Sequence, residues 1–223
     1  MADYNSANIC ITEKSNKALK EKPVYDFFKR LFDIVLSVVA IILLSPILLI
    51  LFIIVKATSK GPAIYKHKRV GKDGKTIYIY KFRSMVVDAD KMIHNFTPEQ
   101  KAEFEKNFKL ENDPRVTKIG KFLRKTSLDE LPQLFNILKG DIAFIGPRPV
   151  TQAETELYGS NRELLLSIRP GLTGFWASGG RSDTSYKRRR AMELYYVKNR
   201  SFGFDIKIFF KTVISVFKGE GAK

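Results

Sequence analysis

The longest hydrophobic run in the chain extends from residue 34 to residue 55 without a charged side chain. A helix needs about 20 apolar residues to cross the hydrocarbon core of a bilayer, so this run is long enough to span one. It is apolar on every face, which argues against the buried helix of a soluble core, and it is too long for a cleaved signal peptide. The hydrophobic pattern therefore predicts a membrane anchor.

Two features of this run favour a re-entrant helix over a spanning helix. Ser45-Pro46 lies at its middle, where proline removes a backbone donor and clashes with the preceding turn, so the helix should bend. Residues 14–30 and 56–72 carry six basic side chains each, so the positive-inside rule gives a spanning helix no preferred orientation. We expect a re-entrant hairpin over residues 26–57 that enters and leaves on the cytoplasmic side, behind a mobile tail at residues 1–25.

After this anchor, residues 58–223 alternate strand-like and helical patterns. Residues 62–65 and 76–82 have the composition of short strands, and the Asp73-Gly74 dipeptide between them is a turn signal, so we expect a β-hairpin. Helical patterns cover 86–109, 116–124, 132–139, 151–167 and 184–198. Within the first of these, Thr97-Pro98 opens a new helix through a cap followed by a proline at the first helical position. The expected fold is α+β and mainly helical.

The C-terminal run 204–217 has lysines on one helical face and phenylalanine, isoleucine and valine on the other. This amphipathic pattern is typical of a surface helix packed on the core. Beside a membrane anchor it is equally typical of a helix that lies in the headgroup region. We therefore expect residues 58–223 to form a small cytoplasmic domain with short strands and interfacial amphipathic helices.

The charge balance of the chain predicts anionic partners. Lysine and arginine number 39 against 23 aspartates and glutamates, which gives a formal net charge of +16. Such an excess favours nucleic acid, anionic lipid or phosphorylated metabolites. An anchored nucleic-acid-binding protein is the non-enzyme alternative, but the chain shows neither a recognition module nor a platform of aromatics on a basic sheet. A single cysteine, Cys10, excludes an internal disulfide, and one cysteine with two histidines is too few for a Cys/His metal cluster.

The run 124–133 is the richest candidate for chemistry, because Asp129 and Glu130 follow two basic residues and precede a predicted helix. If the helix begins at Pro132, its positive dipole end faces both carboxylates. If Ser127 is the cap, Ser127 and Glu130 form a capping box. We expect Asp129 to stay ionised in either case. An ionised carboxylate beside cations can attack phosphorus or hold a metal ion, and the structural alternative is a simple capping pair.

Several cations could surround these carboxylates. Arg148 lies between Pro147 and Pro149, which fix the backbone, and arginine forms bidentate hydrogen bonds to phosphate. Further cations stand at Lys81, Arg83, Arg169 and Arg181. Each alone could be a solvated surface charge, but together they predict a cationic site that suits a diphosphate substrate.

Six motifs follow one another along the chain in a recognisable order. They are KFRSM at 81–85, DPRVTKIG at 113–120, LDELPQLFN at 128–136, GD at 140–141, GPRP at 146–149 and RPGLTG at 169–174. On these motifs the chain closely resembles the bacterial sugar transferases, the monotopic polyprenyl-phosphate phosphoglycosyl transferases, over residues 26 to 220. Larger members carry an N-terminal four-helix membrane region and a further soluble domain, and this chain resembles the minimal catalytic form.

The resemblance implies transfer of a sugar-1-phosphate from a UDP-sugar to undecaprenyl phosphate with release of UMP. Asp129 matches the family nucleophile, which would carry the phospho-sugar covalently, and Glu130 matches the partner carboxylate associated with Mg²⁺. Lys81, Arg124 and Arg181 correspond to active-site cations, and Pro147-Arg148-Pro149 to the nucleotide-side motif. The implied location is the cytoplasmic face of the inner membrane, in contact with its lipids, at the first membrane step of exopolysaccharide, capsule or O-antigen synthesis.

Two positions depart from the family pattern. His67 stands where glutamine is expected, and Ala177-Ser178-Gly179-Gly180 replaces a more usual Gln-Val-Ser-Gly. The segment that follows, 181–199, resembles the branch that transfers hexose-1-phosphates. The residues concerned are Asp183, Tyr186, Tyr195, Tyr196 and Lys198. The resemblance therefore favours galactose or glucose, and an acetamido-sugar-1-phosphate is the alternative.

Overall fold

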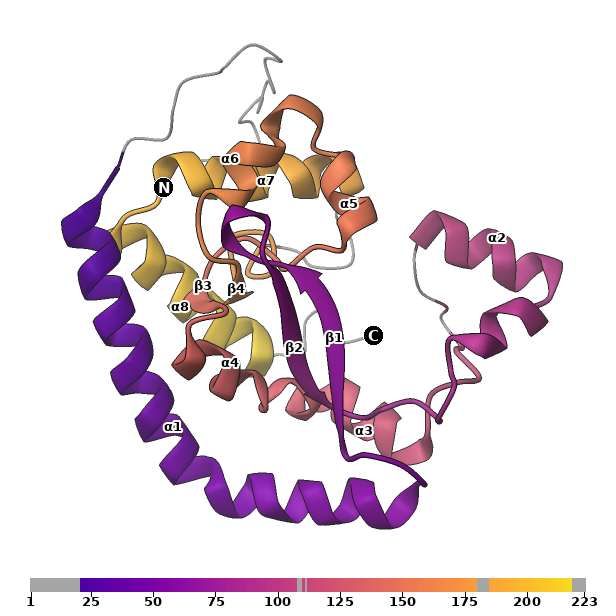
Figure 1. The fold of residues 1–223 in the computed structure, drawn as a ribbon. Coiled ribbons are helices and arrows are strands. Elements are labelled where there is room, and N and C mark those ends of the chain that lie inside the picture. Colours follow the sequence, from indigo (N-terminus) through magenta and orange to yellow (C-terminus); the bar gives the residue numbers. More distant parts are fainter. Residues whose placement is uncertain (1–20, 108–109, 111, 180–184, 218–223) are drawn as a thin grey trace.

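The computed structural model describes residues 21–107, 110, 112–179 and 185–217. Most of the predicted mobile tail, residues 1–25, and Cys10 lie outside the described residues. The described part is mainly helical and contains two small sheets, as expected for an α+β fold. In Figure 1, a long bent helix runs along one side of the molecule, a β-hairpin crosses the centre, and helix α4 packs between them.

Helix α1 (Pro23–Thr58) is continuous, contains Pro46 and is bent about midway along its length (Figure 1). The expected bend is therefore present. Pro46 has no N–H to donate to the carbonyl of Ile42, and Ser45 Oγ donates a hydrogen bond to that carbonyl instead, at 2.8 Å. The two halves form one helix, which begins three residues before the predicted boundary at residue 26.

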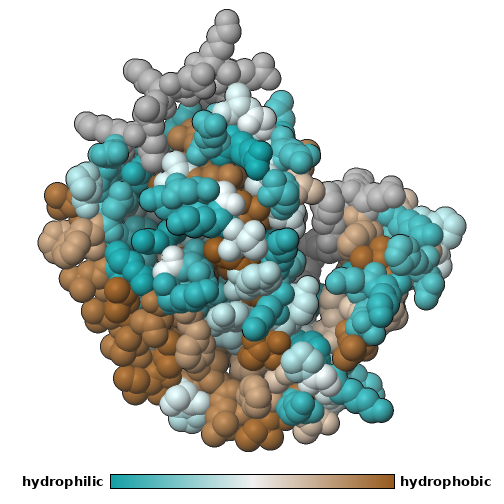
Figure 2. Space-filling view, viewed as in Figure 1, coloured by the Kyte–Doolittle hydropathy of each residue, from teal (hydrophilic) through white to brown (hydrophobic). Residues whose placement is uncertain are grey.

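Among the described helices, α1 alone is long and apolar enough to cross a membrane by length and composition. Its outward face is hydrophobic and largely exposed, and Figure 2 shows this face as a brown band along the lower left of the molecule. Its inner face packs on the domain at two places. Leu51 and Val55 join a core cluster with Leu123, while Ala40 and Leu44 pack on a second cluster. Re-entrant insertion of α1 stays a prediction.

Strands β1 (Ile64–Val70) and β2 (Thr76–Phe82) pair antiparallel along their whole length. Asp73 and Gly74 have positive φ values of 56° and 75°, and the Lys75 amide donates to the carbonyl of Lys72, which makes a type I′ turn. The predicted hairpin is confirmed. Its first strand begins two residues later than predicted and continues to Val70.

A second sheet goes beyond the predicted strands. Strands β3 (Ala143–Ile145) and β4 (Gly171–Thr173) pair in parallel, with Ala143 opposite Gly171. Each has only three residues, which is too short for an alternating pattern to be visible in the sequence. The sheet brings the GPRP and RPGLTG motifs side by side.

The segment 86–109 is only partly helical, against the prediction. Asp88 has a left-handed backbone, with φ 60°, which interrupts a right-handed helix. The helical parts are the 3₁₀ helix η2 (Lys91–Asn95) and α2 (Pro98–Asn107). Thr97 caps α2 as predicted, because its Oγ1 accepts a hydrogen bond from the amide of Gln100 at 3.2 Å. Helix α2 stands out from the rest of the molecule in Figure 1.

Four other helices lie close to their predicted positions. They are α3 (Lys118–Thr126), α4 (Gln133–Lys139), α7 (Tyr186–Asn199) and α8 (Phe202–Phe217). The segment 151–167 is not one helix: it breaks at Gly159, whose φ of 51° does not continue a right-handed helix. Its parts are α5 (Gln152–Glu156), the 3₁₀ helix η4 (Gly159–Asn161) and α6 (Arg162–Leu166). Helix α8 buries Ile208 in the core and leaves Phe210 exposed on its other face.

Candidate active site

Asp129 and Glu130 lie in the tight turn between α3 and α4, on the 3₁₀ helix η3 (Leu128–Glu130). Ser127 ends α3 with a left-handed backbone, φ 57°, and its amide donates to carbonyls of the last turn of α3. Its side chain makes no capping hydrogen bond, so the capping-box alternative is wrong, and α4 begins directly after Pro132. The turn therefore holds both carboxylates at the start of α4.

Asn136 fixes α4 against β2 and thereby sets the distance from the carboxylates to Lys81. Asn136 Oδ1 accepts a hydrogen bond from the Tyr80 amide at 2.8 Å, and its Nδ2 donates to the Tyr78 carbonyl at 2.7 Å. The completely buried side chain thus pairs with β2 as a neighbouring strand would. Lys81, the next residue of β2, reaches across the turn, and its Nζ lies 2.5 Å from Glu130 Oε1.

Ser84, just after β2, is the second residue that fixes the position of the carboxylate turn, because α3 packs on it. A Cβ at Gly120 would overlap the Ser84 carbonyl, so glycine is needed for α3 to approach this closely. The Thr117 amide donates to the same carbonyl at 3.0 Å, and Arg124 Nε donates to Ser84 Oγ at 2.8 Å. Burial lowers the pKa of Arg124, and the nearby carboxylate of Asp129 opposes that shift. Arg124 is thereby held as a partly buried cation beside Asp129.

This close approach predicts that Gly120→Ala destabilises the protein. Because the added Cβ meets backbone, α3 must move, and overpacking of this kind costs about 3 kcal/mol. For a chain of this length we expect the melting temperature to fall by roughly 6–12 °C. Gly203→Ala in α8 is the matched control, because its Cβ would enter open space. Equal melting temperatures for the two variants would contradict the packing of α3 on Ser84.

Asp129 is the more deeply buried of the two carboxylates. The residue is 7% exposed, whereas the Glu130 side chain is 38% exposed. Burial raises the pKa of Asp129 to about 6, against the opposing effect of Lys81 and with a further contribution from Glu130. Burial thus disfavours the ionised form, against the direction expected from the helix start and the cations, but a pKa of about 6 still leaves that form predominant at neutral pH. Asp129 is therefore more basic than an ordinary aspartate. Such a carboxylate is well suited to act as a nucleophile.

The Pro147-Arg148-Pro149 loop is anchored backbone to backbone. The Gly146 amide donates to the Thr173 carbonyl at 2.9 Å, and the Gly171 amide donates to the Pro147 carbonyl at 2.8 Å. A Cβ at Gly146 or Gly171 would overlap main-chain atoms of the facing segment. The glycines of the two motifs therefore allow the contact that fixes this loop.

The guanidinium of Arg148 lies against an aromatic ring. It lies 5.8 Å from the centre of the Trp176 ring, and Arg189 lies 4.4 Å from the same ring. Burial and Arg189 lower the pKa of Arg148, while Glu154 and Glu130 attract its charge. Within the described residues no side-chain hydrogen bond engages this guanidinium. Its donors are therefore available to a phosphate near Glu130.

The structure thus places Lys81, Arg124 and Arg148 around Asp129 and Glu130, and their roles stay predictions. Arg181, the remaining predicted cation, lies outside the described residues, as does Asp183.

Two other cations do not belong to this group, and the expectation that they surround the carboxylates is wrong. Strand β2 ends before Arg83, whose guanidinium donates to the carbonyls of Pro62 and, at 2.7 Å, of Ser59, so it binds the C-terminal end of α1. Arg169 lies close to Arg30 and Asp33 of α1 instead.

The tyrosines that suggested a hexose substrate have different surroundings. Tyr196 is completely buried and donates a hydrogen bond to Asp205 at 2.8 Å, so it is a core residue. Tyr195 is partly exposed and lies against Phe175. Tyr186 packs near Arg189, with 5.3 Å between the guanidinium and the ring centre, and the charge of Arg148 also acts on its hydroxyl, so it lies near the Arg148 loop.

Trp176, Arg189 and Glu193 support Arg148 but are not among the sequence candidates. Trp176 is the only tryptophan of the chain and lies two residues after the RPGLTG motif. This position could have marked it as a candidate site residue. Arg189 stands in the basic run 187–190, which resembles a solvated face. Glu193 follows one helical turn later, accepts a hydrogen bond from the Arg148 amide, and has its pKa raised to about 7 by burial.

His67 faces the same cations from β1. Burial lowers the pKa of His67 to about 4, and Arg69, Lys81 and Arg148 contribute to the shift. The ring is therefore neutral at neutral pH and can donate or accept a hydrogen bond.

Metal binding would depend on the substrate as well as on the protein. Across the described ranges no group of three or more His, Cys, Asp or Glu side chains lies together. Glu130 with Asp129 supplies two carboxylates beside a cationic loop. Mg²⁺ is commonly bound by one or two carboxylates together with water and substrate phosphates, so this donor set fits a magnesium ion shared with a phosphate substrate.

Comparison with known proteins gives a consistent result. The model of the family described as bacterial sugar transferase matches residues 24–219. The chain is 47% identical over 199 residues to an undecaprenyl-phosphate galactose phosphotransferase of Salmonella typhimurium, which covers 88% of this chain and 42% of that protein. It is 43% identical over 204 residues to the exopolysaccharide production protein ExoY of Sinorhizobium fredii, which covers 90% of each.

A third relative is the UDP-glucose:undecaprenyl-phosphate glucose-1-phosphate transferase of Escherichia coli. The identity is 41% over 218 residues, which cover 90% of this chain and 44% of the relative. The chain therefore spans less than half the length of the relatives named for galactose and glucose transfer, and nearly all of ExoY.

Proposed function

Since the chain belongs to the bacterial sugar transferase family, we propose that it is a phosphoglycosyl transferase that moves a hexose-1-phosphate from a UDP-sugar to undecaprenyl phosphate. The observation that carries the proposal is Asp129, a buried and unusually basic carboxylate between Lys81 and Arg124. The guanidinium of Arg148 lies nearby, and no side-chain hydrogen bond from the described residues engages it. These are the groups that an attack on a nucleoside diphosphate sugar needs.

In the first step, a carboxylate oxygen of Asp129 attacks the phosphorus that carries the sugar. A bond forms between this oxygen and phosphorus, the bond from phosphorus to the bridging oxygen of the diphosphate breaks, and UMP leaves with the electron pair. The product is a phospho-sugar held on Asp129 as an acyl phosphate. Arg148 and Lys81 bind the phosphate oxygens during this step, because both present donors beside the carboxylates.

In the second step, a phosphate oxygen of undecaprenyl phosphate attacks the same phosphorus. The new bond gives undecaprenyl-diphosphate-sugar, and the Asp129 carboxylate leaves unchanged. Two successive displacements suit a soluble donor and a lipid acceptor, since the two substrates need not be bound at once.

Mg²⁺ is part of the proposal, with Glu130 as its protein ligand beside Asp129. When bound, the ion would offset negative charge on the departing phosphate. Glu130 is suited to this place because its side chain is partly exposed and Lys81 engages only one of its two oxygens.

Galactose and glucose are the favoured sugars, because relatives that are more than 40% identical are named for them. The role belongs to the first membrane step of exopolysaccharide or related polysaccharide synthesis, which the name of ExoY supports. The full-length protein in lipid, offered one UDP-sugar at a time with undecaprenyl phosphate, should release UMP with UDP-galactose or UDP-glucose. Release with UDP-acetamido sugars alone would select the alternative sugar class, and no release with any donor would reject the function.

Arg148→Lys should lower kcat/KM by roughly 10- to 100-fold. Lysine keeps the charge but loses the planar fork, and a hydrogen bond to a charged group contributes about 1.5–3 kcal/mol. The exposed Arg188→Lys on α7 is the control and should keep wild-type kinetics. Unchanged kinetics in Arg148→Lys would mean that Arg148 does not bind the donor phosphates. We expect the same loss for Arg181→Lys.

The anchor should enter and leave on one side of the membrane. Because the basic flanks of α1 are equal and the helix is bent, tags at residue 10 and residue 223 should both be accessible from the cytoplasm. Pro46→Leu restores the missing backbone donor and should shift part of the population toward a spanning helix. Tags on opposite sides of the wild-type protein would contradict the re-entrant arrangement.

A further inference from the structure

A cavity of about 460 Å³ with many charged residues in its wall lies under the N-terminal half of α1. Its walls are the start of α1, the tip of the β-hairpin, the segment before β4, and the end of α7. The hairpin separates it from the candidate active site: Lys72 and Asp73 at the tip line the cavity, while Lys81 stands at the other end of β2. About five residues of extended strand, roughly 17 Å, lie between them. The cavity has the volume of a small-molecule site.

The cavity wall is more cationic than acidic. Four acidic side chains face six cationic ones, namely Lys22, Lys29, Arg30, Lys72, Arg169 and Arg200. Lys29 and Arg30 are already engaged, by Asp205 and by carbonyls at the end of α4. In contrast, no hydrogen bond or ion pair within the described part of the chain engages the side chains of Lys72 and Arg169. Two cations are thus left to bind an anion.

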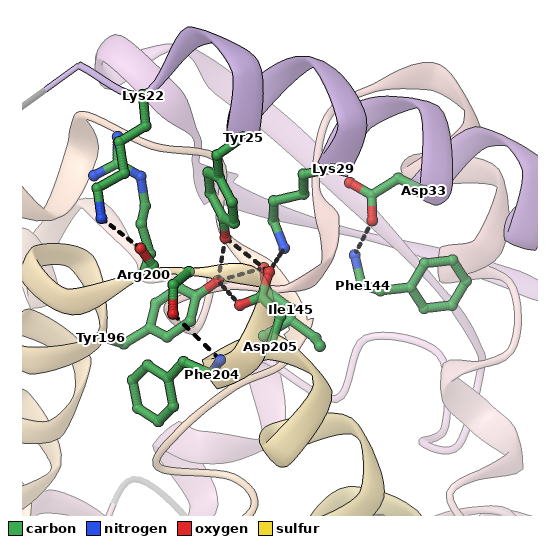
Figure 3. A network of polar contacts seen from close by, with 11 residues as sticks. Lys22, Tyr25, Lys29, Asp33, Phe144, Ile145, Tyr196, Arg200, Phe204 and Asp205 are labelled. Atoms are coloured by element: carbon green, nitrogen blue, oxygen red, sulfur yellow. Dashed lines mark hydrogen bonds and ion pairs between the residues drawn. The ribbon is translucent and has the colours of Figure 1, made fainter.

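The same wall contains an acceptor without a partner. Asp33 is 4% exposed, and its Oδ1 accepts a hydrogen bond from the Phe144 amide at 3.1 Å. Its Oδ2 has no hydrogen-bond partner in the described residues, and Figure 3 shows this oxygen on the side of Asp33 that faces Lys29. Lys29, Arg30 and Arg169 attract the charge of Asp33, but none of them donates a hydrogen bond to Oδ2, so a ligand that brings a donor would be stabilised there.

A network of hydrogen bonds links α1, α7 and α8 beside the cavity. Figure 3 shows Asp205 of α8 receiving hydrogen bonds from Tyr25 and Lys29 of α1 and from Tyr196 of α7. The three distances are 2.7, 2.7 and 2.8 Å. The elements that form the wall are therefore tied together before any ligand arrives.

The ligand must combine an anionic group for Lys72 and Arg169 with a hydrogen-bond donor for Asp33. The wall belongs to the helix that carries the hydrophobic anchor, and Phe27 and Phe32 lie exposed on the same turns of α1. A glycerophospholipid headgroup with a hydroxyl or an ammonium beyond its phosphodiester has this combination. Free phosphate would leave the apolar surroundings of α1 unused, and phosphatidylcholine lacks the donor.

We propose that this cavity binds the headgroup of a donor-bearing glycerophospholipid, such as phosphatidylglycerol or phosphatidylethanolamine, at a site separate from the one that carries out the transfer. The phosphodiester lies against Arg169 and Lys72, and the hydroxyl or ammonium donates to Asp33 Oδ2. This proposal does not depend on the identity of the sugar or on the nucleophile.

Native mass spectrometry of the full chain released from nanodiscs tests the site. Nanodiscs with equal parts of phosphatidylglycerol, phosphatidylethanolamine and phosphatidylcholine should leave one retained lipid on the protein, with either of the first two favoured over phosphatidylcholine. Lys72→Gln and Arg169→Gln should each reduce this occupancy at least tenfold. Lys75→Gln, an exposed lysine at the same hairpin tip, is the matched control and should not.

Asp33→Asn probes the donor, because asparagine can keep the Phe144 contact but offers N–H groups where Oδ2 was. It should remove the preference over phosphatidylcholine. Equal retention in Arg169→Gln and wild type, or equal retention of all three lipids by wild type, would overturn the proposal. Soluble glycerophosphoglycerol is offered as a separate arm. Its binding without any retained lipid would replace the lipid by a free phosphodiester and would likewise overturn the assignment.

Discussion

Asp129→Asn should abolish both turnover and the covalent adduct. Asparagine keeps the shape of the side chain but removes the charge that attacks phosphorus, and loss of a covalent nucleophile typically costs roughly 10,000-fold or more in kcat. Wild-type protein incubated with UDP-galactose or UDP-glucose without lipid acceptor should gain the mass of one hexose-phosphate. Peptide mapping should locate that mass on Asp129.

The folded state should survive this change. Asp129 is a buried carboxylate whose raised pKa shows that its ionised form is disfavoured in the fold, so the neutral asparagine should not lower the melting temperature. An adduct on another residue would reassign the nucleophile. The absence of any adduct, with UMP released only when both substrates are present, would favour direct transfer in a ternary complex.

Glu130→Gln should slow the reaction by roughly 100- to 1,000-fold and weaken its dependence on Mg²⁺. Glutamine can still accept the hydrogen bond from Lys81, but it lacks the charge that attracts a cation. The concentration of Mg²⁺ that gives half-maximal rate should rise at least tenfold. The adduct should still form on Asp129, only more slowly.

Two further variants test whether the altered Mg²⁺ dependence comes from the loss of the Glu130 carboxylate. Glu163→Gln, an exposed glutamate of α6, should leave the Mg²⁺ titration unchanged. Lys81→Gln removes the partner of Glu130 without removing a carboxylate, and should lower the rate while leaving the requirement for Mg²⁺ in place. If Glu130→Gln has the wild-type Mg²⁺ requirement, Glu130 is not a metal ligand.

Most of the secondary structure is predictable because it rests on local signals. Residues adjacent in the sequence determine three of these elements: the type I′ turn at Asp73-Gly74, the cap at Thr97 and the hydrophobic run of α1. The parallel pairing of β3 with β4 is not, because its strands are short and its stability comes from contacts between segments far apart in the chain. The break at Gly159 shows the same limit, since an isolated glycine is tolerated in many helices.

The carboxylates and the prolines around Arg148 are recognisable from their residue types and spacing. Which cations face them is a matter of three-dimensional packing. Arg83 and Arg124 look alike in sequence, yet the first binds the end of α1 and the second is held by Ser84 beside Asp129. Trp176 and Arg189 could not be predicted for the same reason. Both stack beside the Arg148 loop, from which they are separated by 28 and 41 residues in the sequence.

Helix α1 has a practical consequence for anyone who wishes to work with this protein. Leu51 and Val55 fill part of the core, and the guanidinium of Arg30 binds the carbonyls of Ile137 and Leu138 at the end of α4. A truncation that removes the whole of α1 would therefore remove core packing and break the hydrogen bonds from Arg30 to the end of α4, the helix that follows the carboxylate turn. A foreign transmembrane segment put in its place would have to keep the side chains of α1 that face the domain, among them Leu51 and Val55.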